Sequence, residues 1–97
     1  MKAKRGPEAE VAALLAQNPN LTHSDNRKVL THVQRNEDDW IVNTLTIEGY
    51  DVPFIYRRKK PYQSLNGARV NLTYYPEVKQ IAGIDFETMK VVRLRRS

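Results

Sequence analysis

The segment His23-Ser24-Asp25 contains the three residue types of a hydrolytic triad within one short stretch of chain. A working triad is assembled from separate elements, because the base, the nucleophile and the orienting carboxylate need a geometry that adjacent residues do not provide. We therefore interpret this segment as a helix cap or a turn. No catalytic residue is predicted, and we do not expect the chain to be an enzyme.

Metal and cofactor chemistry also lacks its usual residues. The chain contains no Cys, which excludes disulfides, thiolate zinc sites and cysteine nucleophiles. His23 and His32 have no third ligand at a metal spacing, so we interpret both as solvated histidines. The four Gly fit no phosphate-binding loop. We expect no metal and no cofactor.

The segment 56–62 carries the most specific chemical signal, because it places four consecutive cations between two tyrosines. Lys and Arg neutralise phosphates, and aromatic rings stack on bases. Further arginines near other strand ends could extend the same basic rim. The predicted nucleic-acid-binding residues are Tyr56, Arg57, Arg58, Lys59, Lys60, Tyr62, Arg69, Arg93, Arg95 and Arg96. Two plainer interpretations stay open: the cations protect a sheet edge from aggregation, and Tyr56 belongs to the core.

The overall charge agrees with a polyanionic partner. Sixteen Lys and Arg against eleven Asp and Glu give a formal net charge of +5 and a pI near 9.7. We predict a small basic binding module for nucleic acid, with RNA or single-stranded DNA favoured over base-specific reading of a duplex. The alternative is a protein-binding module that presents a sheet edge and the basic rim to an acidic protein. The sequence does not indicate an oligomeric state.

The N-terminus and the apolar runs indicate the compartment. Residues 1–6 are basic, but Pro7 and Glu8 follow where a signal peptide would have an apolar run. The longest apolar run, residues 11–16, is too short to cross a bilayer. Together with the absence of Cys, these features predict a cytoplasmic protein without a membrane segment.

The length of 97 residues allows one domain, which we place at residues 7–97 behind a flexible basic tail at residues 1–6. Val11, Leu14 and Leu15 recur at helical spacing and predict a helix over residues 7–17. Residues 24–34 are ambiguous. They fit a second helix capped by Ser24, which would resemble a helix-turn-helix, or a strand over residues 28–35. The β-branched residues favour the strand.

The rest of the chain shows alternating patterns typical of strands, at residues 40–48, 52–59, 68–75, 81–87 and 89–95. A turn is predicted at residues 76–79. Val70, Leu72 and Tyr74 are expected to face inward, and so are Ile84 and Phe86. We predict an α+β fold in which the N-terminal helix packs on a curled antiparallel sheet of four to five strands, forming a small, partly closed barrel.

The segment Leu65-Asn66-Gly67-Ala68-Arg69-Val70 opens one of these strands within a meander. It resembles strand starts in small barrels of the OB and SH3-like kinds, and it covers six residues. The chain departs from the usual OB order, which places a helix between the third and fourth strands, because only a short turn is predicted near Pro76.

Overall fold

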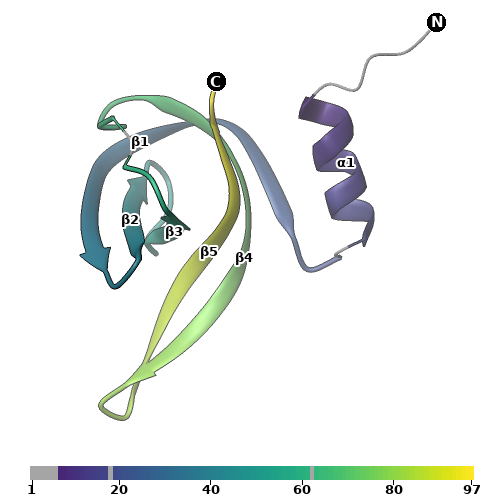
Figure 1. The fold of residues 1–97 in the computed structure, drawn as a ribbon. Coiled ribbons are helices and arrows are strands. Elements are labelled where there is room, and N and C mark those ends of the chain that lie inside the picture. The colour runs from purple at the N-terminus through teal and green to yellow at the C-terminus, as the bar shows by residue number, and fades with distance from the viewer. Residues whose placement is uncertain (1–6, 18, 62) are drawn as a thin grey trace, which may run out of the picture.

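The computed structural model describes residues 7–17, 19–61 and 63–97. One helix precedes five strands along the chain (Figure 1). The elements are α1 (Pro7–Gln17), β1 (Thr22–Glu37), β2 (Trp40–Ile47), β3 (Phe54–Arg58), β4 (Arg69–Ile81) and β5 (Ile84–Arg96). The helix predicted over residues 7–17 is confirmed. The predicted basic tail and Tyr62 lie outside the described residues.

The five strands close into a ring in the order β1-β2-β3-β5-β4. β3 and β5 pair in parallel, at Phe54 with Met89 and at Ile55 with Lys90, and the other four pairings are antiparallel. The α+β class agrees with the prediction, but the expectation of a purely antiparallel sheet is wrong. The alternation of apolar residues that predicts a strand does not reveal its direction, so the crossover that brings β5 beside β3 was not visible.

β1 closes the ring because it serves two partners. Its first half pairs with β4 from Thr22 to Lys28, and its second half pairs with β2 from Val29 to Glu37. The register shifts between Ser24 and Arg27, where Asn26 has a φ of 56°. A bulge of this kind bends a strand and increases its twist.

The strand interpretation of residues 28–35 is therefore confirmed, and the helix alternative is wrong. The expectation of a cap or turn at residues 23–25 is also wrong, because these residues lie within β1. Each half of β1 forms its backbone hydrogen bonds with a different strand, β4 for the first half and β2 for the second, and a local pattern in the sequence does not show these partners.

The predicted turn at residues 76–79 is wrong, because β4 continues to Ile81. Opposite Pro76, Met89 donates its N–H to the carbonyl of Pro53, the residue just before β3, at 2.9 Å. The backbone nitrogen of Pro76 therefore points toward the open edge of β4. No described strand pairs with that edge at this position, so the N–H that proline lacks costs no hydrogen bond between strands. The chain turns instead at Ala82 and Gly83, with φ values of 53° and 81°.

The core fills the ring with side chains from the strands and from one loop residue. Its members are Val29, Leu45, Ile47, Phe54, Leu65, Val70, Leu72, Tyr74, Val91 and Leu94. The inward positions predicted on β4 are confirmed, at Val70, Leu72 and Tyr74. On β5 a register shift opposite Thr73 and Tyr74 inserts Val92 as an extra residue, so Val91 and Leu94 are buried while Val92 is exposed.

The expected inward positions at Ile84 and Phe86 are wrong, since these side chains are 59% and 46% exposed. The ends of β4 and β5 extend beyond the ring as a two-stranded hairpin (Figure 1). With no third strand beside it, this hairpin has no core to enter.

α1 lies beside the ring and contributes no residue to the core cluster (Figure 1). Val11 is its buried apolar side chain among the residues whose side chains are described. The predicted covering role of the helix is wrong in this respect, because the ring covers its own apolar interior. No described helix is long and apolar enough to span a membrane.

Candidate functional site

A groove of about 730 Å³ opens on the ring where β3 separates from β5. The two strands pair only at Phe54 and Ile55, and the remaining residues of β3 diverge from β5. The groove is lined by Trp40, Ile55, Tyr56, Arg57, Glu77, Lys79, Lys90, Val91 and Val92. Strands β2 and β3 form one wall, and the β4–β5 hairpin forms the other.

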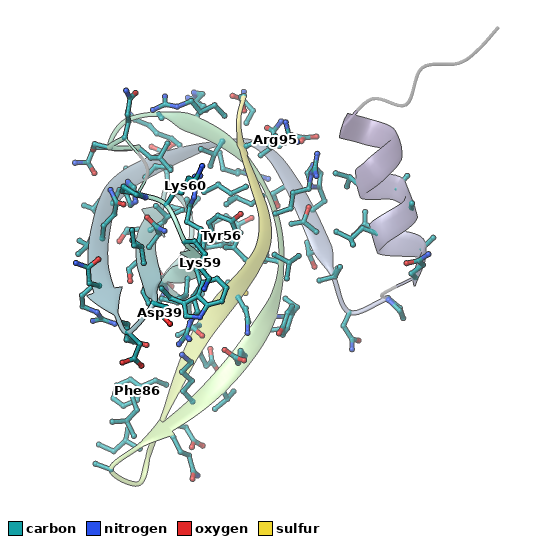
Figure 2. All side chains as sticks on the ribbon, viewed as in Figure 1. Asp39, Tyr56, Lys59, Lys60, Phe86 and Arg95 are labelled. Atoms are coloured by element: carbon teal, nitrogen blue, oxygen red, sulfur yellow. The ribbon has the colours of Figure 1, made fainter. Side chains whose placement is uncertain are left out.

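The aromatic part of the groove centres on Trp40, which is 41% exposed. Ile41 pairs with Arg58, so the register of β2 and β3 brings Trp40 beside Lys59. The Lys59 ammonium lies 4.7 Å from the centroid of the indole ring, a cation–π contact. Figure 2 labels Lys59 and Tyr56 close to each other in the view.

Arg57 reaches Glu37 across the neighbouring strands, with its Nη2 atom 3.3 Å from a carboxylate oxygen. Arg35 approaches the other oxygen of the same carboxylate at 3.5 Å. All three side chains are exposed, so the pairs contribute about 1 kcal/mol or less each. Their effect is mainly to orient the Arg57 guanidinium at the mouth of the groove.

The remaining cations of the predicted segment lie around the end of β3. Arg58 is half-buried, and Lys60 is exposed beyond the strand. Tyr56 is half-buried, packs against the core and also lines the groove.

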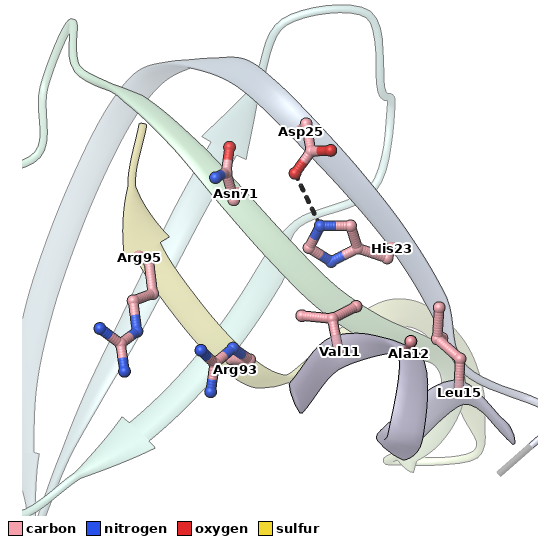
Figure 3. A pocket seen from close by; sticks show the side chains of 8 residues that line it. All are labelled: Val11, Ala12, Leu15, His23, Asp25, Asn71, Arg93 and Arg95. Atoms are coloured by element: carbon pink, nitrogen blue, oxygen red, sulfur yellow. Dashed lines mark hydrogen bonds and ion pairs between the residues drawn. The ribbon is translucent and has the colours of Figure 1, made fainter. Parts of the chain in front are cut away.

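The predicted arginines outside this segment do not line the groove. Arg69 donates from Nη1 to the carbonyl of Asn26, at 3.1 Å, and Arg96 donates from Nη2 to the carbonyl of Ser64, at 3.3 Å. Arg93 and Arg95 line a second hollow beside α1 (Figure 3). The groove and this hollow share no lining residue. The structure therefore divides the predicted basic rim into separate surfaces.

Lys79 and Lys90 line the groove but were not predicted from the sequence. They lie on β4 and β5, far along the chain from residues 56–62, and join the groove only through the pairing of β5 with β3. Trp40 could have been found from its sequence, because it is the one Trp of the chain and follows a turn, where an aromatic side chain is readily exposed.

The residues that resemble a triad are divided between the two faces of β1. His23 contacts Asp25, with Nε2 2.7 Å from the carboxylate, and its Nδ1 atom lies 2.9 Å from the hydroxyl of Thr73. Ser24 points into the ring, where its hydroxyl lies 2.8 Å from that of Tyr74. Alternation along the strand thus keeps Ser24 away from His23 and Asp25. Thr73 is fully buried and so is not exposed to a substrate.

Within residues 7–17, 19–61 and 63–97, no group of three or more His, Asp or Glu is arranged to hold a metal ion. Comparisons of the chain with protein-family models, with curated proteins and with solved structures gave no match. Any inference about function therefore depends on the residues and their geometry.

Proposed function

We propose that this domain is a non-catalytic module that binds single-stranded nucleic acid, either RNA or single-stranded DNA, in the groove beside β3. The proposal depends on one observation above all. An exposed Trp40 ring, contacted by Lys59, lies in a groove whose walls carry Arg57, Lys79 and Lys90. The absence of Cys supports a reducing compartment such as the cytoplasm.

The chemistry of the groove matches a single strand. A base can stack on the exposed part of the Trp40 ring, a contact worth about 1–3 kcal/mol in such proteins. Lysines on the opposite wall are placed to neutralise phosphates and release counterions. Glu77 is the one carboxylate that lines the groove, so cations outnumber acids there. Duplex DNA is a poorer match, because residues 24–34 form a strand and no recognition helix results.

The shape of the ring gives further support. A five-stranded ring with a long, bent first strand resembles the OB barrels, in which the face of the second and third strands binds oligonucleotides together with two loops. Those loops join the first strand to the second and the fourth to the fifth. Here the groove lies between β2–β3 and the β4–β5 hairpin. The absence of a helix between β3 and β4 among the described residues is a departure from the usual OB order.

The test is a titration of the protein with single-stranded oligouridylate, oligothymidylate and a DNA duplex at about 50 and 200 mM salt. Trp40 is the only Trp, so its fluorescence reports stacking directly. We expect quenching by the single strands, and binding that weakens steeply at the higher salt. Trp40→Ala should weaken binding by roughly 5- to 100-fold, whereas Trp40→Phe should retain much of the affinity. Neither variant contains a Trp, so their binding is measured by the anisotropy of a fluorescently labelled strand.

Charge variants separate the groove from general basicity. Combined Lys79→Gln and Lys90→Gln should lower the affinity and reduce the salt dependence. Lys28→Gln, on an exposed part of β1, is the matched control and should have little effect. Equal losses of affinity in the control and in the groove variants would show that the binding is only non-specific charge attraction. A folded protein that binds neither single strand would refute the proposal.

A protein-binding role is the second candidate, and the β4–β5 hairpin favours it. The hairpin exposes apolar side chains at Val78, Ile81, Ile84 and Phe86, with exposed fractions between 46% and 59%. Exposed apolar clusters often mark protein interfaces. If the hairpin variant Ile81→Ser with Ile84→Ser loses cellular partners while the groove variants retain them, this second role is correct.

A further inference from the structure

The second hollow lies between α1 and the outer surface of β1, β4 and β5 (Figure 3). Its volume is about 430 Å³, within the range of roughly 300–1,000 Å³ that is usual for small-molecule sites. One wall is apolar and comes from the helix: Val11, Ala12 and Leu15. The other wall is polar and comes from the sheet: His23, Asp25, Asn71, Arg93 and Arg95.

Hydrogen bonds fix the polar wall in place. Both nitrogens of the His23 ring have partners, Asp25 on one side and Thr73 on the other. The side-chain oxygen of Asn71 accepts the backbone N–H of Asn26 at 2.8 Å and the hydroxyl of Ser97 at 2.7 Å. Because this oxygen is occupied, the Nδ2 amide group is the donor that Asn71 can offer to a ligand.

The charges of the hollow favour an anion. Arg93 and Arg95 are two residues apart on β5, so both side chains lie on the same side of the strand (Figure 3). Asp25 is the one carboxylate in the lining, and its contact with the His23 ring occupies one of its oxygens. A guanidinium group binds a carboxylate through two parallel hydrogen bonds. Two such groups beside an apolar wall match a molecule with an anionic head and an apolar tail.

We propose that this hollow binds a small amphiphilic carboxylate. The carboxylate accepts hydrogen bonds from the Arg93 and Arg95 guanidinium groups and from Nδ2 of Asn71. The apolar tail lies along the helix, against Val11 and Leu15. The site is independent of the nucleic-acid groove, since the two share no lining residue.

The test uses three probes on the full chain: octanoate, acetate and octylamine. Binding is measured by calorimetry and by shifts of backbone amide NMR signals. We expect octanoate to bind and to shift the amides of Val11, Asn71 and Arg93. Acetate lacks the tail and octylamine has the opposite charge, so both should bind at least about tenfold more weakly, because each removes one of the two kinds of contact.

Variants assign the two contacts separately. Arg95 is exposed, so Arg95→Gln should leave the fold intact and weaken octanoate binding by about tenfold or more. Leu15→Ser should weaken octanoate and leave the weak binding of acetate unchanged. Arg35→Gln, on the far half of β1, is the matched control and should not alter affinity. Absence of octanoate binding, or binding that Arg95→Gln and Leu15→Ser leave unchanged, would overturn the proposal.

Discussion

The hydroxyl groups of Ser24, Tyr50 and Tyr74 form a hydrogen-bonded row next to the core. Ser24, the serine of the apparent triad, therefore has a structural partner in Tyr74. Tyr74 lies 2.8 Å from Ser24 and 3.4 Å from Tyr50, measured between hydroxyl oxygens. The rings of Tyr50 and Tyr74 both meet Phe54 edge to face, with centroids 5.1 and 4.9 Å away. Aromatic packing therefore fixes the hydroxyls in place.

In this row of hydroxyl groups, the pKa values of Tyr50 and Tyr74 shift in opposite directions. The hydrogen bond from Tyr74 lowers the pKa of Tyr50, with help from Ser24 and the nearby Arg27. Burial raises the pKa of Tyr74. We expect Tyr74→Phe to raise the pKa of Tyr50 toward the usual tyrosine value, because the main donor is removed. NMR titration of tyrosines labelled at the ζ carbon measures this, and an unchanged pKa of Tyr50 would contradict the hydrogen bond.

The direction of the pH effect on stability follows from the same shifts. The folded pKa of Tyr74 lies above the ordinary value of 10.0, so the folded state holds this proton longer than the unfolded state does. The contribution of Tyr74 to stability is thus fully present at pH values below the ordinary pKa of 10.0, and it is lost as the pH rises through the folded pKa. Tyr50 acts in the opposite sense, since its lowered pKa adds stability as the pH rises toward the ordinary value.

His32 shows why a single side chain is hard to interpret from sequence. It was expected to be solvated, but it is half-buried and hydrogen-bonded. The backbone N–H of Leu65 donates to its Nδ1 atom at 2.9 Å, and its Nε2 atom lies 2.8 Å from the side-chain oxygen of Asn43. Asn43 in turn donates to the carbonyl of Tyr56 at 3.2 Å. These partners are far apart in the chain, so no local pattern indicates them.

Among the elements, the β4–β5 hairpin contains the clearest strain. Its two-residue turn gives both Ala82 and Gly83 a positive φ, which suits Gly but not Ala. Replacing Ala82 by Asn, which tolerates this conformation, should raise the free energy of unfolding by about 0.5–1 kcal/mol. Thermal unfolding would show a higher Tm, by several degrees. Ala82→Val should lower the Tm, because a β-branched residue fits this conformation poorly; equal Tm values for both variants would contradict the turn geometry.

The strands themselves were largely predictable, and their partners were not. Alternation located β2, the start of β4 and the inward Val70, Leu72 and Tyr74. A turn was predicted at residues 76–79 because proline usually interrupts a strand. Proline is tolerated within a strand where its nitrogen faces an open edge, and the sequence does not show which edge is open. For the groove, Tyr56 and Arg57 belong to the segment that the sequence had singled out, but Lys79 and Lys90 required the parallel pairing of β3 with β5. Long-range pairing is the information that periodicity lacks.

At the scale of the whole molecule, the core cluster lies inside the ring and α1 lies outside it. Every member of the core cluster comes from the segment after residue 28. The molecule is elongated, with extents of 54 × 30 × 29 Å. The β4–β5 hairpin and the helix project from different sides of the ring (Figure 1). The two candidate sites lie where these projections meet the ring, and they share no lining residue.

Removal of residues 1–20 tests this arrangement. We expect the shortened chain to keep its β-sheet circular dichroism and cooperative unfolding, with a loss of about 2 kcal/mol or less, because Val11 is the buried side chain that the described helix supplies. The same deletion removes the apolar wall of the second hollow. It should therefore abolish octanoate binding and leave the quenching of Trp40 by single strands in place. A shortened chain that is unfolded would show instead that the ring depends on the helix, because without α1 the strands alone would not bury enough apolar surface to hold the fold.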